Sequence, residues 1–123
     1  MSDLQEHTVA QLAEIAEPGA LEFSVGDGDW PFRGVVVRWQ GEVRAYENVC
    51  PHAGHSLNLV PTGFFTPDYT QLICSSHGAL FAPDTGVCTG GPCAGDALRA
   101  LECRVEGDAV VVMAPTAQEN SRR

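Results

Sequence analysis

Two short segments of the chain each combine one cysteine and one histidine with a glycine close behind them. The first reads CPHAG (residues 50–54), the second reads CSSHG (residues 74–78), and 21 residues separate His52 from Cys74. A thiol and an imidazole one or two residues apart reach a common centre only where the backbone turns sharply, and proline and glycine permit such turns. One such loop would fit a buried cysteine beside a structural histidine equally well. Two together offer four ligands and predict a metal centre built from both loops.

The way the ligands are distributed narrows the choice of metal. Zinc accepts any mixture of thiolate and imidazole, but its structural sites usually take pairs of like ligands from one segment. Here each loop supplies one cysteine and one histidine. This arrangement favours a [2Fe–2S] cluster with two different irons, one held by cysteines and the other by histidines. A structural zinc site is the less favoured alternative.

The sequence around the two loops resembles the Rieske iron–sulfur signature. CPHAGHSL and CSSHGALF match C-x-H-x-G-x-x-L and C-x-x-H-G, and GGP (residues 90–92) matches the proline loop that covers the cluster. The resemblance implies one Rieske-type [2Fe–2S] cluster per chain. It places Cys50 and Cys74 on the inner iron, and His52 and His77 on the outer, solvent-facing iron. These four residues are the predicted cofactor and metal ligands, and no catalytic residue is predicted.

Four further positions indicate which kind of Rieske protein the chain resembles. High-potential members have an additional cysteine in each loop that forms a disulfide clamp, and here these positions hold His55 and Ser76. The same members place a serine and a tyrosine hydroxyl near the cluster, whereas this chain has Ala79 and Phe81. Hydrogen bonds to the cluster sulfurs raise the reduction potential. The chain therefore resembles the soluble low-potential Rieske ferredoxins, and we expect a potential near the bottom of the family range.

The function that this resemblance implies is transfer of one electron from a flavin reductase to an oxygenase or a related oxidoreductase. The alternative is the small Rieske subunit of an assimilatory nitrite reductase, but the four intact ligands favour a working carrier. A Rieske oxygenase needs a second iron held by two histidines and a carboxylate, and only His7 and His55 are left for it. A nucleophilic Cys50 beside His52 would not explain the repeated pattern at Cys74. We therefore expect an electron carrier without a small-molecule substrate, and not an enzyme.

The charge of the chain restricts its partners. Sixteen acidic residues against seven basic ones give a net charge of −9, which repels phosphate backbones and anionic lipid surfaces. Nucleic acid and membrane are therefore not expected as partners, whereas a protein with a basic docking face is. No signal peptide or transmembrane segment is predicted. The odd count of five cysteines fits a reducing compartment, and a cytoplasmic location is expected.

The order of segments predicts one all-β domain, residues 1–123, and the resemblance implies small antiparallel sheets with a loop-built cluster-binding subdomain. Strands are predicted at residues 6–9, 20–25, 32–40, 42–47, 99–105 and 109–113, with one helical turn within residues 10–16. The cluster-binding subdomain is predicted at about 48–93 and the base β-subdomain at about 6–47 and 94–114. Residues 115–123 are expected to be a loose tail. The middle segment is expected to consist of loops held by something other than a core of their own.

One insertion departs from the pattern of oxygenase ferredoxins. The separation of the two ligand loops is longer than is typical, and residues 59–71, LVPTGFFTPDYTQ, account for the excess. One interpretation is a surface excursion whose aromatic side chains, Phe64, Phe65 and Tyr69, pack back on the domain. The other is a loop that contacts a partner.

Three cysteines are not assigned to the cluster. Cys88 and Cys93 lie on either side of the GGP segment. They are compatible with two buried thiols, a local disulfide or a redox-sensing pair, and the sequence does not choose between these. Cys103, in a strand pattern, is predicted to be a small core residue.

Overall fold

The computed structural model describes residues 5–26, 32–49, 57, 63–74, 78–91 and 95–114. These residues form strands and one 3-10 turn, and no α-helix occurs among them. In chain order the elements are β1 (Gln5–Gln11), η1 (Leu12–Glu14), β2 (Gly19–Val25), β3 (Phe32–Trp39), β4 (Glu42–Glu47), β5 (Leu72–Ile73), β6 (Leu80–Phe81), β7 (Cys88–Gly90), β8 (Ala100–Leu101), β9 (Cys103–Glu106) and β10 (Ala109–Ala114). The all-β prediction is confirmed. No helix in the described part of the chain is long and apolar enough to cross a membrane.

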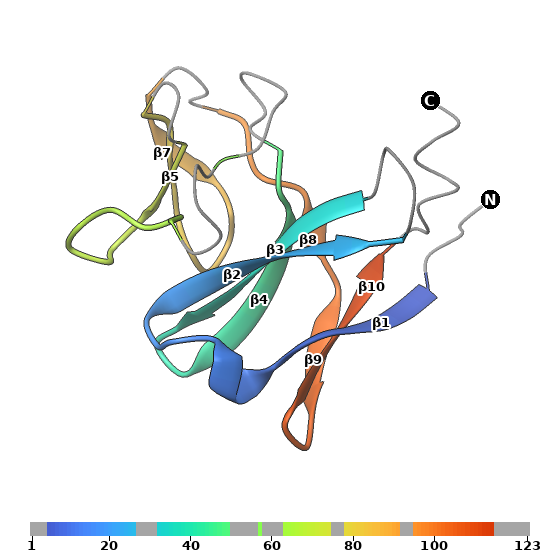
Figure 1. Ribbon diagram of the computed structural model, residues 1–123. Helices are drawn as coiled ribbons and strands as arrows, with labels where there is room; N and C mark the ends of the chain where they lie inside the picture. Colours follow the sequence, from blue (N-terminus) through green and yellow to red (C-terminus); the bar gives the residue numbers. More distant parts are fainter. Residues whose placement is uncertain are drawn as a thin grey trace.

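The strands form three antiparallel sheets (Figure 1). A central sheet has the order β2-β3-β4-β8, a base sheet the order β1-β10-β9, and a third sheet the order β5-β6-β7. The base sheet and the third sheet lie on different sides of the central one in Figure 1. The third sheet contains the segment that leads into the second Cys-His loop, so we call it the cluster sheet.

The central sheet is buried on both faces because β3 is apolar at consecutive positions. Val35 and Val37 face a core shared with the cluster sheet, whereas Val36 faces a core shared with the base sheet. All three side chains have 0% exposure. Successive side chains of a strand point to opposite faces, so an uninterrupted apolar run suits a strand covered on both sides.

Gly34 shows how closely the core on the base side is packed. A Cβ atom at this position would lie 2.3 Å from Cζ of Phe23, its cross-strand partner on β2. The ring of Phe23 therefore occupies the space that a side chain at position 34 would need. Only glycine permits this packing without displacing the ring.

The core between the central sheet and the cluster sheet contains side chains from both. The middle segment, expected to lack a core of its own, contributes several buried side chains to it. These are Leu57, Phe64, Leu72, Cys74, Ala79, Phe81 and Cys88. The middle segment is therefore held by a core that it shares with Val35, Val37 and Tyr46 of the central sheet. The apolar residues of this segment are spread over short strands and loops, with no period that reveals them as one buried surface.

The predicted strand at residues 99–105 is divided in the structure. β8 pairs with β4 in the central sheet, and β9 pairs with β10 in the base sheet. Glu102 lies between them, and its carbonyl oxygen accepts a hydrogen bond of 2.9 Å from the amide of Met113. The chain therefore changes sheets within a continuous strand-like pattern. The bounds of β2, β3, β4 and β10 agree with the predicted strands, whereas β1 is longer than expected.

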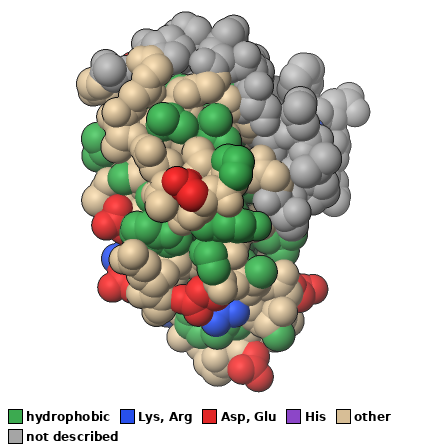
Figure 2. Space-filling view, turned by 90° about the vertical axis from the view of Figure 1, so that its left-hand side faces the viewer, with side chains coloured by type: hydrophobic (Ala, Val, Ile, Leu, Met, Phe, Trp, Pro, Cys, Tyr) green, Lys and Arg blue, Asp and Glu red, His purple; other side chains and the backbone are tan. Residues whose placement is uncertain are grey.

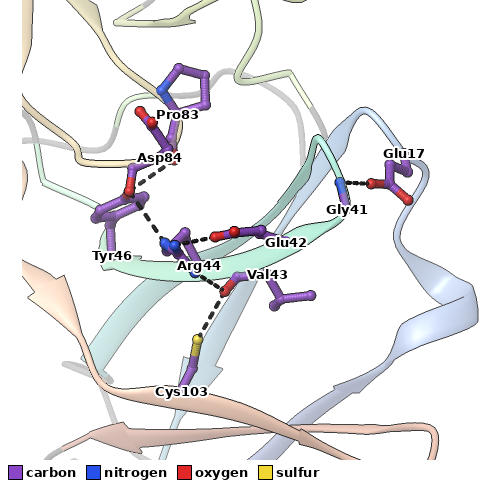
Figure 3. A network of polar contacts seen from close by, with 9 residues as sticks. All are labelled: Glu17, Gly41, Glu42, Val43, Arg44, Tyr46, Pro83, Asp84 and Cys103. Carbon is purple, nitrogen blue, oxygen red and sulfur yellow. Dashed lines mark hydrogen bonds and ion pairs between the residues drawn. The ribbon is translucent and has the colours of Figure 1, made fainter.

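Tyr46 of β4 fastens the turn between β6 and β7 to the central sheet (Figure 3). Its side chain is buried, and its hydroxyl donates a 2.8 Å hydrogen bond to the carbonyl oxygen of Pro83. A Cβ atom at Gly86 would lie 2.7 Å from Cε1 of the same ring, so the turn wraps closely around it. Arg44 Nε adds a hydrogen bond of 3.3 Å to the carbonyl oxygen of Asp84. These contacts hold the cluster sheet in a fixed position on the central sheet.

We predict that Tyr46→Phe lowers the free energy of unfolding by about 1 to 3 kcal/mol at neutral pH, because the buried Pro83 carbonyl loses its donor. Burial raises the pKa of the Tyr46 hydroxyl from 10.0 to about 12. Because the folded pKa lies above the ordinary value, this stabilisation is complete below pH 10 and is lost as the pH rises toward 12. The thermal unfolding midpoints of Tyr46→Phe and of the unmodified protein should therefore converge above pH 10. A difference between the two midpoints that does not depend on pH would contradict the prediction.

Candidate metal centre

The structure describes one of the four predicted ligands. Cys74 directly follows β5, and its side chain has 0% exposure. Cys50, His52 and His77 lie outside the described residues, as do His55 and Ser76. The site is therefore built here from Cys74 and from the residues that fix the ends of the two ligand loops.

Hydrogen bonds close the second ligand loop at its base. The amide of Cys74 donates to the carbonyl oxygen of Ala79 over 2.9 Å, and the amide of Gly78 donates to the carbonyl oxygen of Cys74, also over 2.9 Å. Gly78 has a φ of +74°, a conformation that favours glycine. The pairing of Ile73 with Leu80 continues this connection as a hairpin. The sharp turn expected at Gly78 is confirmed, and the ends of the segment that contains His77 are fixed.

Asn48 closes the first ligand loop. It is a buried polar residue with 1% exposure, and its Oδ1 accepts a 2.9 Å hydrogen bond from the amide of Leu57. Its own amide donates to the carbonyl oxygen of Arg33 over 3.0 Å. One side chain thus joins the two ends of the segment that contains Cys50 and His52. Asn48 was not predicted from the sequence. The signal was an amide residue between the end of β4 and the first cysteine.

We predict that Asn48→Ala lowers both the stability and the cluster content of the purified protein. The buried Leu57 amide would lose its acceptor, which costs about 1 to 3 kcal/mol. Iron content per chain and the thermal midpoint measure the two effects. Asn48→Asp is the matched comparison, since it keeps an oxygen acceptor and adds a buried charge. An alanine variant with unchanged stability and iron content would show that this contact does not hold the loop.

The start of the GGP segment packs against the exit of the second ligand loop. A Cβ atom at Gly91 would lie 2.8 Å from Cα of Ala79 and 3.2 Å from the carbonyl oxygen of Gly78, and Gly91 has a φ of +89°. Both the close approach and the backbone conformation require glycine. Pro92 lies outside the described residues. The predicted covering loop therefore begins in contact with the segment that follows His77.

Two positions that were used to assign the redox class are fully buried. Ala79 and Phe81 have 0% exposure and belong to the same core as Cys74. Neither side chain can donate a hydrogen bond to a sulfur. The low reduction potential remains a prediction.

The remaining cysteines differ in their surroundings. Sγ of Cys88 lies 3.2 Å from the carbonyl oxygen of Gly90. Cys93 lies outside the described residues, so a pairing of the two stays open. Cys103 packs against the core on the base side, 3.6 Å from the carbonyl oxygen of Val43, and burial raises the pKa of its thiol. The prediction of a small core residue is confirmed only in part, because Cys103 is half-buried at the edge of that core.

The insertion folds back only in part. Phe64 is fully buried and Phe65 packs against the core between the central sheet and the cluster sheet. Tyr69 has 48% exposure, so the expectation that all three aromatic residues pack back was wrong for this one.

The donor set fits an iron–sulfur cluster. Among the described residues there is no group of three or more cysteine, histidine, aspartate or glutamate side chains that could hold a metal. Cys74 offers a buried sulfur on a loop closed by backbone hydrogen bonds. Two cysteines and two histidines are the ligands that a Rieske [2Fe–2S] centre uses.

An all-β fold of small antiparallel sheets, in a chain with a C-x-H and a C-x-x-H motif, is typical of Rieske-type iron–sulfur proteins. The model of the Rieske [2Fe-2S] domain family matches residues 5–115. The chain therefore belongs to this family, and the prediction of one [2Fe–2S] cluster is confirmed. A search of curated proteins found no significant match.

Solved structures show the same fold. The ferredoxin of carbazole 1,9a-dioxygenase from Nocardioides aromaticivorans IC177 is 28% identical with a TM-score of 0.69, and the match covers 91% of this chain and 99% of that one. The ferredoxin of Sphingomonas yanoikuyae B1 is 21% identical with a TM-score of 0.69, over 90% of this chain and 100% of that one. The terminal oxygenase of carbazole 1,9a-dioxygenase from Novosphingobium sp. KA1 is 20% identical with a TM-score of 0.72, over 90% of this chain and 30% of that one.

Proposed function

We propose that this protein carries single electrons on its Rieske cluster, from a flavin reductase to an oxygenase or a related oxidoreductase. The observation that carries the proposal is the match to the Nocardioides dioxygenase ferredoxin, which extends over 99% of that protein. A further similar structure is a complex of an oxygenase with its ferredoxin in carbazole 1,9a-dioxygenase, 23% identical with a TM-score of 0.67 over 90% of this chain and 94% of that one. We also propose that the protein is a carrier without a substrate, and that it is cytoplasmic.

The proposed ligands are Cys50 and Cys74 for the inner iron and His52 and His77 for the outer one. When bound, the cluster supplies a one-electron centre, and its two neutral imidazoles place family potentials at about −150 to +300 mV. The chain itself supplies the shape of the site. Asn48 and the Cys74–Ala79 hydrogen bond close the two loops, and Cys74 and Ala79 at the ends of the second loop are buried. The division into a cluster-binding subdomain at about 48–93 and a base remains part of the proposal.

A relay assay tests this function. Catalytic amounts of a flavin-containing ferredoxin reductase with NADH should bleach the visible spectrum of the oxidised protein, and added cytochrome c should restore it. The rate of cytochrome c reduction should increase with the concentration of the protein, and the Cys74→Ser variant should give only the background rate. A cluster that dithionite reduces but that exchanges no electrons with either protein would contradict the proposal.

A further inference from the structure

The outward side of the cluster sheet is uncharged and mostly apolar, and no element among the described residues covers it. Leu72, Phe81 and Cys88 point inward and are buried. The alternate positions point outward: Ile73 and Leu80 are partly exposed, and Val87 has 48% exposure. None of the three short strands contains a charged residue. Figure 2 views the molecule from this side and shows hydrophobic side chains gathered on it. We call the surface formed by Ile73, Leu80, Val87 and the adjacent Tyr69 the docking face.

Tyr69 adds an exposed aromatic ring on a turn whose geometry is fixed. The indole of Trp39 donates a 2.9 Å hydrogen bond to the Tyr69 carbonyl oxygen, and the ring of Phe65 lies 5.4 Å from the tyrosine ring between centroids. Oδ1 of Asp68 accepts hydrogen bonds from the hydroxyls of Thr66 and Thr70 at 2.6 and 2.8 Å. An exposed aromatic side chain on a preorganised turn loses little entropy when it is buried by a partner.

The turn and the sheet form a continuous surface. The hydroxyl of Thr89 on β7 donates a hydrogen bond to the side-chain oxygen of Gln71, which ends the turn that presents Tyr69. Ile73 immediately precedes Cys74. A protein bound here would therefore lie against the strand that leads into a proposed cluster ligand, and electron transfer requires such proximity more than tight binding.

The charge around this surface is of one sign. From residue 48 to residue 98 the sequence has no lysine or arginine, and its only acidic residues are Asp68, Asp84 and Asp96, all exposed. Hydrogen bonds from Thr66 and Thr70 lower the pKa of Asp68, so this carboxylate stays ionised. The nearest arginine that contacts this segment, Arg44, is paired with Glu42. An apolar patch with an acidic rim complements a partner with an apolar patch and a basic rim.

We propose that the docking face binds a basic redox-partner protein, whose apolar centre covers Val87 and Tyr69 and whose lysine or arginine side chains face Asp68. This inference rests on the proposed function. A second copy of the chain fits the surface less well, because the aspartates of the two copies would face one another. Transient redox complexes are small, so a patch of this kind suffices.

Stopped-flow reduction of cytochrome c, a small basic redox protein, tests the apolar part of the face. The prereduced holoprotein is mixed with oxidised cytochrome c, and second-order rate constants are compared. Val87→Ser and Tyr69→Asn should each lower the rate constant at least about fivefold, as for contact residues near the centre of an interface. Asparagine tolerates the positive φ of position 69. Val105→Ser is the matched control, because Val105 is 40% exposed on β9 of the base sheet, and its rate should equal that of the unmodified protein.

A pair of charge variants tests the rim. Asp68→Asn keeps an oxygen that accepts the hydrogen bonds from Thr66 and Thr70, and it removes the negative charge. It should lower the rate at low salt and make the rate less dependent on ionic strength. Asp108→Asn removes the same charge from the β9–β10 turn and should change the rate clearly less. Equal effects of the two variants would show that only net charge matters and would overturn the assignment of the rim.

Two further measurements separate failure of this inference from failure of the proposed function. Ferricyanide is a small acceptor that needs no docking face, so its reduction should be equally fast in every variant. A parallel loss with ferricyanide would overturn the inference by assigning the effect to the cluster. Equal rates of cytochrome c reduction for Val87→Ser and Val105→Ser would also overturn the inference. The same holds if sedimentation shows that the unmodified protein is a dimer and that Val87→Ser dissociates it. A protein that reduces neither acceptor would contradict the proposed function itself.

Discussion

Cys74→Ser is expected to abolish the Rieske cluster in a protein that still folds. Cys74 is fully buried at the end of β5 and is the proposed ligand that the structure describes directly. A serine hydroxyl is not deprotonated near neutral pH, and iron–sulfur clusters select soft thiolate ligands. Iron and acid-labile sulfide per chain should fall at least about tenfold, and the reduced sample should give no Rieske paramagnetic-resonance signal.

The matched control is Cys88→Ser. Cys88 is also buried, belongs to the same core and undergoes the same change of one atom. It is not a proposed ligand, so its cluster content should stay close to that of the unmodified protein. Loss of the cluster in both variants would show that a buried thiol in this core is needed for packing. Full cluster content in Cys74→Ser would remove Cys74 from the ligand set.

Gly91→Ala is expected to have the second largest effect. The new Cβ atom would lie 2.8 Å from Cα of Ala79, which is backbone and cannot rotate away. The residue would also have to hold a φ of +89°, which costs an L-residue about 1 to 2 kcal/mol. Overpacking adds about 1 to 3 kcal/mol. We therefore expect a loss of about 2 to 5 kcal/mol in unfolding free energy, together with reduced cluster content.

Gly95→Ala separates the clash from the backbone strain. Gly95 has a φ of +96°, but nothing lies within 4 Å of a Cβ atom placed there. The unfolding free energy of this variant should fall only by the cost of the backbone conformation, and the variant should keep its cluster. Thermal midpoints and iron content, measured side by side, give the comparison. Equal losses in the two variants would show that the contact between Gly91 and Ala79 does not matter.

The sequence was sufficient to predict the parts of the fold that local patterns determine. The hairpin of β3 and β4 and the strand β10 follow from short apolar runs bounded by turn residues. The second ligand loop turns at Gly78, as the CSSHG pattern predicts. Each of these features depends on residues close together in the chain, so a single sequence contains enough information to place them.

Features that depend on distant partners could not be predicted. Residues 99–105 read as one strand, but β8 and β9 pair with different sheets, and the pairing partners decide this. Asn48 reads as an ordinary polar residue until the amide of Leu57 is placed beside it. In each case the deciding contact lies with a segment that no local period identifies.

The most direct test of the ligand assignment is the paramagnetic-resonance spectrum of the dithionite-reduced protein, recorded together with its metal content. We expect a red-brown sample with two irons and two labile sulfides per chain and a Rieske-type signal, because two histidines and two cysteines hold the cluster. The signal should disappear in His52→Ala and in His77→Ala and persist in His55→Ala. A colourless sample with one zinc per chain, or an undiminished signal in the His52 and His77 variants, would contradict this assignment.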